Sequence, residues 1–135
     1  MTGPARMRMA AAARRALAGS SALLAMALLV QAFTAGMAAM TDPGWWAVHL
    51  AWIRIFQWLV LVMPASAILA DVPRRTKWAS AAPLPLIGLQ YVLAHRGLDG
   101  TLPVGLGLHA ITAMLLFSVA AFVAAAAWRE GGSPA

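Results

Sequence analysis

The chain has 135 residues, of which 62% are hydrophobic and 10% are charged, and its mean hydropathy is +0.78. Soluble domains carry about 25% charged residues, so this composition excludes a soluble globule and a disordered chain and predicts an integral membrane protein. The formal net charge of +6 does not indicate a nucleic-acid partner, because the basic residues gather beside apolar runs, where a lipid bilayer places them.

Four apolar runs follow a basic tail, and each is long enough, or nearly so, to cross a hydrocarbon core about 30 Å thick as a helix. The basic tail is predicted at residues 1–15, the helices at 16–40, 45–70, 78–96 and 103–128, and a C-terminal tail at 129–135. The short connections force neighbouring helices to be antiparallel. The sequence therefore predicts an all-α fold in which residues 1–135 form one domain, an integral membrane up-down-up-down four-helix bundle.

Turn-forming and charged residues separate the runs. The predicted connections are residues 41–44, 71–77 and 96–100. Within the runs, Pro64 predicts a kink in the second helix, and Pro83 with Pro85 predicts a loosened start of the third, because proline cannot donate the helical hydrogen bond.

Basic residues predict the orientation. Eight of them lie in the N-terminal tail, the middle connection and the C-terminal end: Arg6, Arg8, Arg14, Arg15, Arg74, Arg75, Lys77 and Arg129. The opposite side has one, Arg96. The positive-inside rule therefore predicts a multi-pass protein of the cytoplasmic (inner) membrane with both termini in the cytoplasm. A secretory signal peptide is the alternative for the first run, which is long for the apolar part of such a peptide.

Polar residues inside the runs are the candidate functional groups, because polar groups are costly in hydrocarbon. They are Gln31, Thr34, His49, Arg54, Gln57, Gln90, Tyr91, His109 and Thr112. No run contains Asp or Glu. Because a small proton-coupled exporter needs a membrane carboxylate, that class of transporter is disfavoured.

His49 and His109 form the candidate metal site. Each lies a few residues after the outer end of its helix, so the two imidazoles are expected at similar depth on parallel, diagonally placed helices. This spacing would admit one metal between two facing imidazoles, or a haem. The alternative for either histidine alone is a hydrogen bond to a neighbouring helix.

Three further residues belong to the candidate cofactor site. Gln31 and Gln90 are expected to form hydrogen bonds between helices, and Arg54 could meet an anionic group such as a haem propionate, or could snorkel to lipid phosphate. His95 would complete a three-histidine zinc or copper site, but the neighbouring cation Arg96 disfavours a bound dication.

Several segments resemble an uncharacterised family of small four-span bacterial membrane proteins. They are Val30–Gly36, Val48–Leu50, Leu89–Gln90, Leu108–Ala110 and Leu115–Phe117. The resemblance implies architecture and a polar set of Gln31, His49, Gln90 and His109, but no activity. The chain departs from that pattern at Trp52 and Arg54.

The chain is also loosely similar to four-helix membrane b-type cytochromes, in which histidines on the second and fourth helices hold haem. That likeness implies haem b ligated by His49 and His109 on the outer side, and two histidine ligands favour electron transfer over oxygen chemistry. The sequence has no cysteine, so covalent attachment of a c-type haem is excluded.

No motif in the chain specifies a reaction, and we do not expect an enzyme on its own. The best interpretation is a small membrane protein that binds haem b for electron transfer. One alternative is a non-catalytic accessory subunit that assembles with a membrane protein partner or as a homo-oligomer. Another is a binder of a quinone or other amphipathic ligand through Gln31, Arg54 and Gln90. The lipid bilayer is the expected surrounding in each case.

Overall fold

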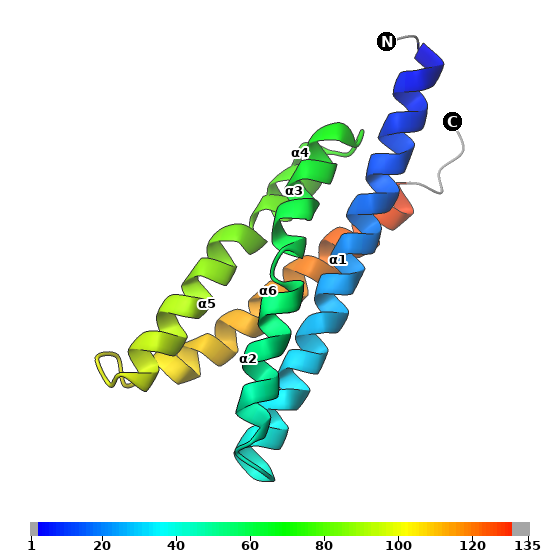
Figure 1. Cartoon of the computed structure of the whole chain (residues 1–135). Coiled ribbons are helices and arrows are strands. Elements are labelled where there is room, and N and C mark those ends of the chain that lie inside the picture. The colour runs from blue at the N-terminus through cyan, green and yellow to red at the C-terminus, as the bar shows by residue number, and fades with distance from the viewer. Residues whose placement is uncertain (1–2, 131–135) are drawn as a thin grey trace.

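The computed structural model describes residues 3–130, and within them every regular element is a helix. The helices are α1 (Gly3–Met40), α2 (Trp45–Phe56), α3 (Leu59–Leu69), α4 (Arg74–Ala81), α5 (Pro83–Leu98) and α6 (Gly105–Arg129) (Figure 1). Helix α3 continues the course of α2, and α5 continues that of α4, so the chain forms four helical rods. The expected all-helical class is therefore correct for the part of the chain that the structure describes.

Helix α1 is much longer than the sequence predicts. It begins at Gly3, whereas the predicted start is residue 16, so the basic segment is the first part of the helix and not a separate tail. The reason is composition, because alanine and arginine are strong helix formers and they dominate this segment. At 1.5 Å per residue its 38 residues extend about 57 Å, and Figure 1 shows its N-terminal end reaching beyond the other helices.

Pro64 accounts for the break between α2 and α3. It lacks the N–H that would bond the carbonyl of Val60, so the preceding turn tightens. The N–H of Val60 bonds the carbonyl of Gln57 at 3.2 Å, and that of Leu61 bonds the carbonyl of Trp58 at 3.0 Å, each over three residues instead of four. The two helices remain one nearly continuous apolar rod.

Two prolines likewise divide the third rod. Pro83 and Pro85 remove the helical donors on either side of Leu84, and α4 ends at Ala81 just before them. Helix α4 itself begins at Arg74, inside the segment predicted as a loop, with Pro73 at its N-cap. The missing N–H of proline costs nothing there, because the first N–H groups of a helix have no partner within the helix.

Within residues 3–130, three helices are long and apolar enough to cross a membrane. They are Gly3–Met40, the combined rod Trp45–Leu69 and Gly105–Arg129. Many of their large apolar side chains are exposed, among them Phe33, Ile55, Ile68 and Met114. A surface of this kind is stable in lipid and not in water, so the structure is that of a membrane protein.

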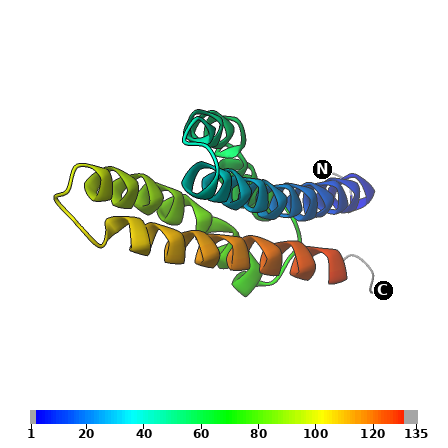
Figure 2. The ribbon, with the colours of Figure 1, turned by 90° about the horizontal axis from the view of Figure 1, so that it is seen from below.

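The hydrophobic core lies toward the end of the molecule where α1, α3 and α6 meet. Leu17, Leu24, Met63, Leu116 and Val123 are completely buried there. Helix α2 packs against α1, and α5 packs against α6, but the two pairs separate toward their connecting loops (Figures 1 and 2). The chain therefore forms two helical hairpins, α1 with α2–α3 and α4–α5 with α6, which are joined at one end and open at the other.

Each hairpin turns through an aspartate. The Asp42 carboxylate accepts a hydrogen bond from the backbone N–H of Gly44 at 2.8 Å. The Asp99 carboxylate accepts bonds from the hydroxyl and the N–H of Thr101, at 2.6 and 2.9 Å, and these bonds lower the pKa of Asp99. Gly100 follows with a φ of +76°, a left-handed conformation that glycine adopts without steric cost.

Two glycines allow α5 and α6 to approach closely at this end. A Cβ atom built on Gly105 would lie 2.7 Å from the carbonyl oxygen of Leu93 and 2.9 Å from the backbone nitrogen of Gly97. A Cβ atom on Gly97 would lie 2.8 Å from the backbone nitrogen of Leu106. This close backbone contact sets the register in which Gln90 meets His109.

Candidate functional site

In the first hairpin, Gln31 of α1 and His49 of α2 hold one another by reciprocal hydrogen bonds. The imidazole Nδ1 of His49 lies 3.1 Å from the main-chain carbonyl oxygen of Gln31. In return, the side-chain amide of Gln31 donates to the carbonyl oxygen of His49 at 3.2 Å. The same amide nitrogen lies 2.9 Å from His49 Nε2.

The second hairpin repeats this arrangement with Gln90 of α5 and His109 of α6. His109 Nδ1 lies 3.1 Å from the main-chain carbonyl oxygen of Gln90, and the Gln90 amide donates to the carbonyl oxygen of His109 at 3.0 Å. Threonine supports both pairs, since Thr34 Oγ1 lies 3.1 Å from His49 Nδ1 and Thr112 Oγ1 accepts from the Gln90 amide at 2.8 Å. We call each reciprocal pair of hydrogen bonds a Gln–His clasp.

The clasps fix the tautomer of each histidine. A carbonyl oxygen only accepts, so the neighbouring Nδ1 carries the proton in both imidazoles. The lone pair is therefore on Nε2 in His49 and in His109. Metal-bound histidines commonly have this arrangement, in which one ring nitrogen donates to a main-chain carbonyl and the other is free to ligate.

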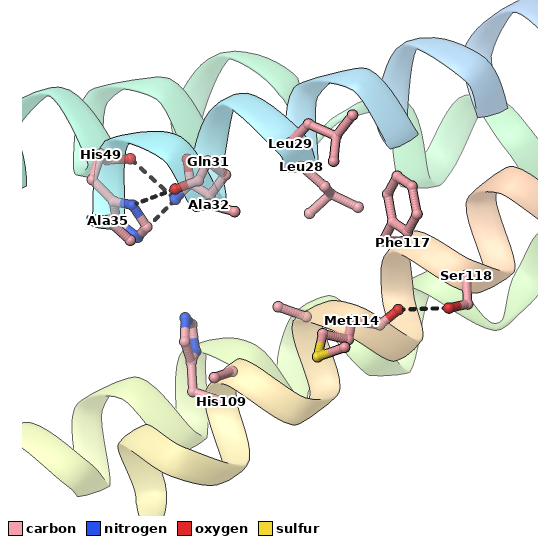
Figure 3. Close-up of a pocket in the computed structure, with 12 residues that line it drawn as sticks. Leu28, Leu29, Gln31, Ala32, Ala35, His49, His109, Met114, Phe117 and Ser118 are labelled. Atoms are coloured by element: carbon pink, nitrogen blue, oxygen red, sulfur yellow. Dashed lines mark hydrogen bonds between the residues drawn. The ribbon is translucent and has the colours of Figure 1, made fainter. Parts of the chain in front are cut away.

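Both histidines line the same two cavities, which lie side by side in the opening between the hairpins. The cavities have volumes of about 600 and about 530 Å³, within the usual range for ligand sites. They share six lining residues: Leu28, Gln31, Ala35, His49, His109 and Ala113. Figure 3 shows His49 on one wall and the His109 ring pointing toward it from the other.

Most of the remaining lining is apolar, and small side chains keep the opening wide. Ala32 and Ala35 lie on α1, and Ala110 and Ala113 lie on α6. Larger side chains close the far side of the second cavity: Trp46, Leu50, Ile53, Phe56, Ile87, Leu98, Leu106 and Leu116. Such a lining suits a flat, apolar cofactor better than a hydrated ion.

Tryptophans fix the position of α2 against α1. The indole N–H of Trp52 donates to the carbonyl oxygen of Ala27 at 2.9 Å. The Trp46 ring meets the His49 ring edge to face, with centroids 5.3 Å apart. Trp52, where the chain departs from the family pattern, thus anchors the helix that carries His49.

The structure brings four of the five predicted cofactor residues to one place. Gln31 and both histidines line the two cavities, and Gln90 lines the second. Arg54 is exposed and lines neither cavity, so the structure does not place it with the other four.

His95 lines the second cavity with His49 and His109 but forms no clasp. Its exposed side chain bonds the carbonyl oxygen of Tyr91 at 2.8 Å. Among residues 3–130 no group of three His, Asp or Glu side chains could hold a metal ion, so the three-histidine alternative finds no support. Tyr91 is a residue whose role the sequence did not indicate: its hydroxyl donates to the side-chain carbonyl of Gln57 at 2.9 Å and so links the two hairpins.

The fold and the paired clasps thus define a small helical membrane protein with a two-histidine site between its hairpins. Residues 31–97 match the model of a family of unknown function, DUF6220. This match confirms the expected likeness to an uncharacterised family, and the matched segment contains Gln31, His49 and Gln90 but ends before His109. No curated protein and no solved structure matches the chain.

Proposed function

We propose that this protein binds haem b between His49 and His109 and transfers electrons within the membrane. The observation that supports the proposal is the pair of Gln–His clasps, which give both imidazoles an Nε2 lone pair beside a shared apolar opening. Haem b would supply reversible one-electron transfer at its iron. The proposal includes a four-helix bundle that crosses the inner membrane up-down-up-down with both termini in the cytoplasm.

The residues of the site fit this cofactor in three respects. Two neutral imidazole nitrogens are a suitable axial ligand set for haem iron. The alanines of α1 and α6 leave room for a planar ring, and the surrounding aromatic and aliphatic side chains exclude water from it. The main-chain carbonyl oxygens of Gln31 and Gln90 hold the protons on Nδ1 and so keep both rings oriented.

The symmetry of the site also favours a single central cofactor. The two hairpins contribute equivalent histidines, each four residues after the first residue of the second arm of its hairpin. A single haem b bound between the hairpins would be held by both histidines, one from each clasp. Two histidine ligands favour electron transfer over oxygen chemistry.

The test is an absorption spectrum of the protein purified in detergent from haem-replete cells. We expect a sharp α-band in the reduced-minus-oxidised spectrum, and its loss in His49→Ala and in His109→Ala, because each variant lacks one axial ligand. Arg54→Ala is the control on the helix that carries His49 and should keep the band, since Arg54 is exposed and lines neither cavity. A colourless wild-type protein would overturn the proposal, provided that circular dichroism shows intact helices.

A further inference from the structure

The Arg54 side chain is exposed on the outer side of α2, within the apolar rod Trp45–Leu69. We infer that this face of α2 docks a membrane-spanning helix of another protein, and that this helix carries an aspartate or a glutamate at the depth of Arg54. The docking surface is separate from the proposed haem site, because Arg54 lines neither cavity.

The place of Arg54 along the rod puts it far from both membrane surfaces. It lies three residues before Gln57, the middle residue of this 25-residue rod, which corresponds to about 4.5 Å. In a rod centred in a hydrocarbon core about 30 Å thick, the Arg54 backbone would therefore be about 10 Å from the nearer boundary. Long basic side chains reach lipid phosphate mainly from helix ends, so Arg54 is poorly placed for that contact.

The chain itself has no counter-charge at this depth. Its four acidic residues all lie in connections between helices or after the end of α6: Asp42, Asp71, Asp99 and Glu130. A second copy of the chain has the same lack, and its own Arg54 would bring another cation to the same face. The counter-charge must therefore come from a different protein.

The side of α2 that carries Arg54 points away from the rest of the molecule. On the opposite side, the Trp52 indole bonds the main chain of α1 and the Phe56 ring is buried. Figure 2 shows α1 between α2 and α6. At 100° per residue, Ala47 and Ala51 lie within about 60° of Arg54, and both are exposed. Small side chains at this spacing allow a second membrane helix to approach closely.

A carboxylate is the group that best complements Arg54. The planar guanidinium presents a fork of N–H donors that matches the two oxygens of a carboxylate. A lone charge on either helix is costly in hydrocarbon, and the pair removes both costs at once. A fully apolar helix on this face would instead cover the guanidinium without pairing it. Charge complementarity therefore favours an acidic helix as the occupant.

The test uses the full-length protein in phosphatidylcholine vesicles at pH 8 and a synthetic membrane-spanning polyleucine peptide with one central glutamate. Energy transfer from a dye on Thr41→Cys, in the turn before α2, to a dye on the peptide measures their association. We expect the glutamate peptide to associate about tenfold more tightly than the same peptide with a central leucine, because a hydrogen bond between charged groups contributes at least that factor.

Variants of the same protein identify the residue responsible. Arg54→Leu should abolish the preference for the glutamate peptide, whereas Arg54→Lys should keep part of it. Arg96→Leu is the matched control, since it removes an exposed arginine near the end of α5, and should keep the full preference. Arg54→Leu should also melt at the same temperature as the wild type or higher, because it removes an exposed cation.

Two results would overturn the inference. Equal association of both peptides with the wild-type protein would leave lipid phosphate as the partner of Arg54. A lower melting temperature of Arg54→Leu would show that Arg54 acts within the fold. Neither result bears on haem binding, which the α-band reports separately.

Discussion

Gln31 and Gln90 show how a single side chain can fix a histidine at membrane depth. In each case the main-chain carbonyl of the glutamine accepts a hydrogen bond from the imidazole N–H. The side-chain amide of the same glutamine donates a hydrogen bond to the main-chain carbonyl of the histidine. The imidazole N–H and the histidine carbonyl are thereby satisfied in a medium that offers no water, where an unpaired polar group is costly. The clasp therefore both stabilises a hairpin and selects the tautomer with the lone pair on Nε2, which in His49 lies 2.9 Å from the Gln31 amide nitrogen.

Thr34 offers a direct measure of what the first clasp contributes to stability. Its buried hydroxyl donates to the Gln31 carbonyl at 2.9 Å and lies 3.1 Å from His49 Nδ1. We expect Thr34→Val to lower the free energy of unfolding by about 1 kcal/mol, since hydrogen bonds between membrane helices contribute roughly 0.6 to 1.7 kcal/mol. Denaturant titration in detergent micelles measures the change. Thr41→Val, at an exposed position, is the control, and equal effects of the two variants would contradict this account.

The sequence predicted which residues form the candidate site better than how they contact one another. Depth along a helix follows from residue counting, so His49 and His109 could be paired in advance. The clasps could not be predicted, because they depend on the register between two helices, and small differences in packing decide that register. One signal was present in the sequence. A glutamine stands 18 residues before His49 and 19 residues before His109. This similar spacing across each turn could have indicated that both hairpins contain a Gln–His clasp.

At the scale of the elements, the interruptions of the helical rods follow from the prolines, as the sequence predicts, whereas neither the interruptions nor the helix ends follow from hydropathy. Pro64 breaks its rod at Gln57 and Trp58, and Pro83 with Pro85 divides the third rod into α4 and α5. Hydropathy averages over a window and does not register where a backbone donor is lost. Hydropathy also separates the charged start of α1 from the apolar run that follows, so this start was predicted as a tail. Arginine nevertheless forms helices readily.

The close contact between α5 and α6 makes Gly105 a specific requirement of the second hairpin. We expect Gly105→Ala to destabilise the protein by about 1 to 3 kcal/mol, because the added methyl group would meet backbone atoms at 2.7 and 2.9 Å that cannot move independently. It should also weaken haem binding, since the displacement shifts His109 relative to Gln90. Thermal unfolding followed by circular dichroism measures the first effect and the α-band the second.

Gly107→Ala is the matched control on the same helix. Nothing lies within 4 Å of a Cβ atom at that position. Alanine is favoured over glycine in a helix by up to about 1 kcal/mol, so this variant should be as stable as the wild type or slightly more stable. If Gly107→Ala destabilised the protein as much as Gly105→Ala, helix contact would not be the cause.

At the scale of the whole molecule, the two hairpins are equivalent units side by side. Each has an aspartate in its turn, a glutamine in its first arm and a histidine near the start of its second. The arms are joined through the core of α1, α3 and α6, and they separate toward the turns. The site therefore lies between the core and the turns, and Leu28, Phe56 and Leu116 of the core form part of its lining. A ligand there could link the two hairpins.

The orientation of the molecule can be tested directly, because the chain has no cysteine. Positive residues gather at the N-terminal part of α1, at the start of α4 and at the C-terminal end of α6. We therefore expect these three places to face the cytoplasm and both hairpin turns to lie outside. Single variants Thr41→Cys and Thr101→Cys should react with a membrane-impermeant maleimide in intact cells, whereas Lys77→Cys should react only after the cells are permeabilised. Labelling of Lys77→Cys alone in intact cells would show the opposite orientation. Labelling of Lys77→Cys and Thr101→Cys from the same side would show that α4 and α5, divided by two prolines, do not cross the membrane.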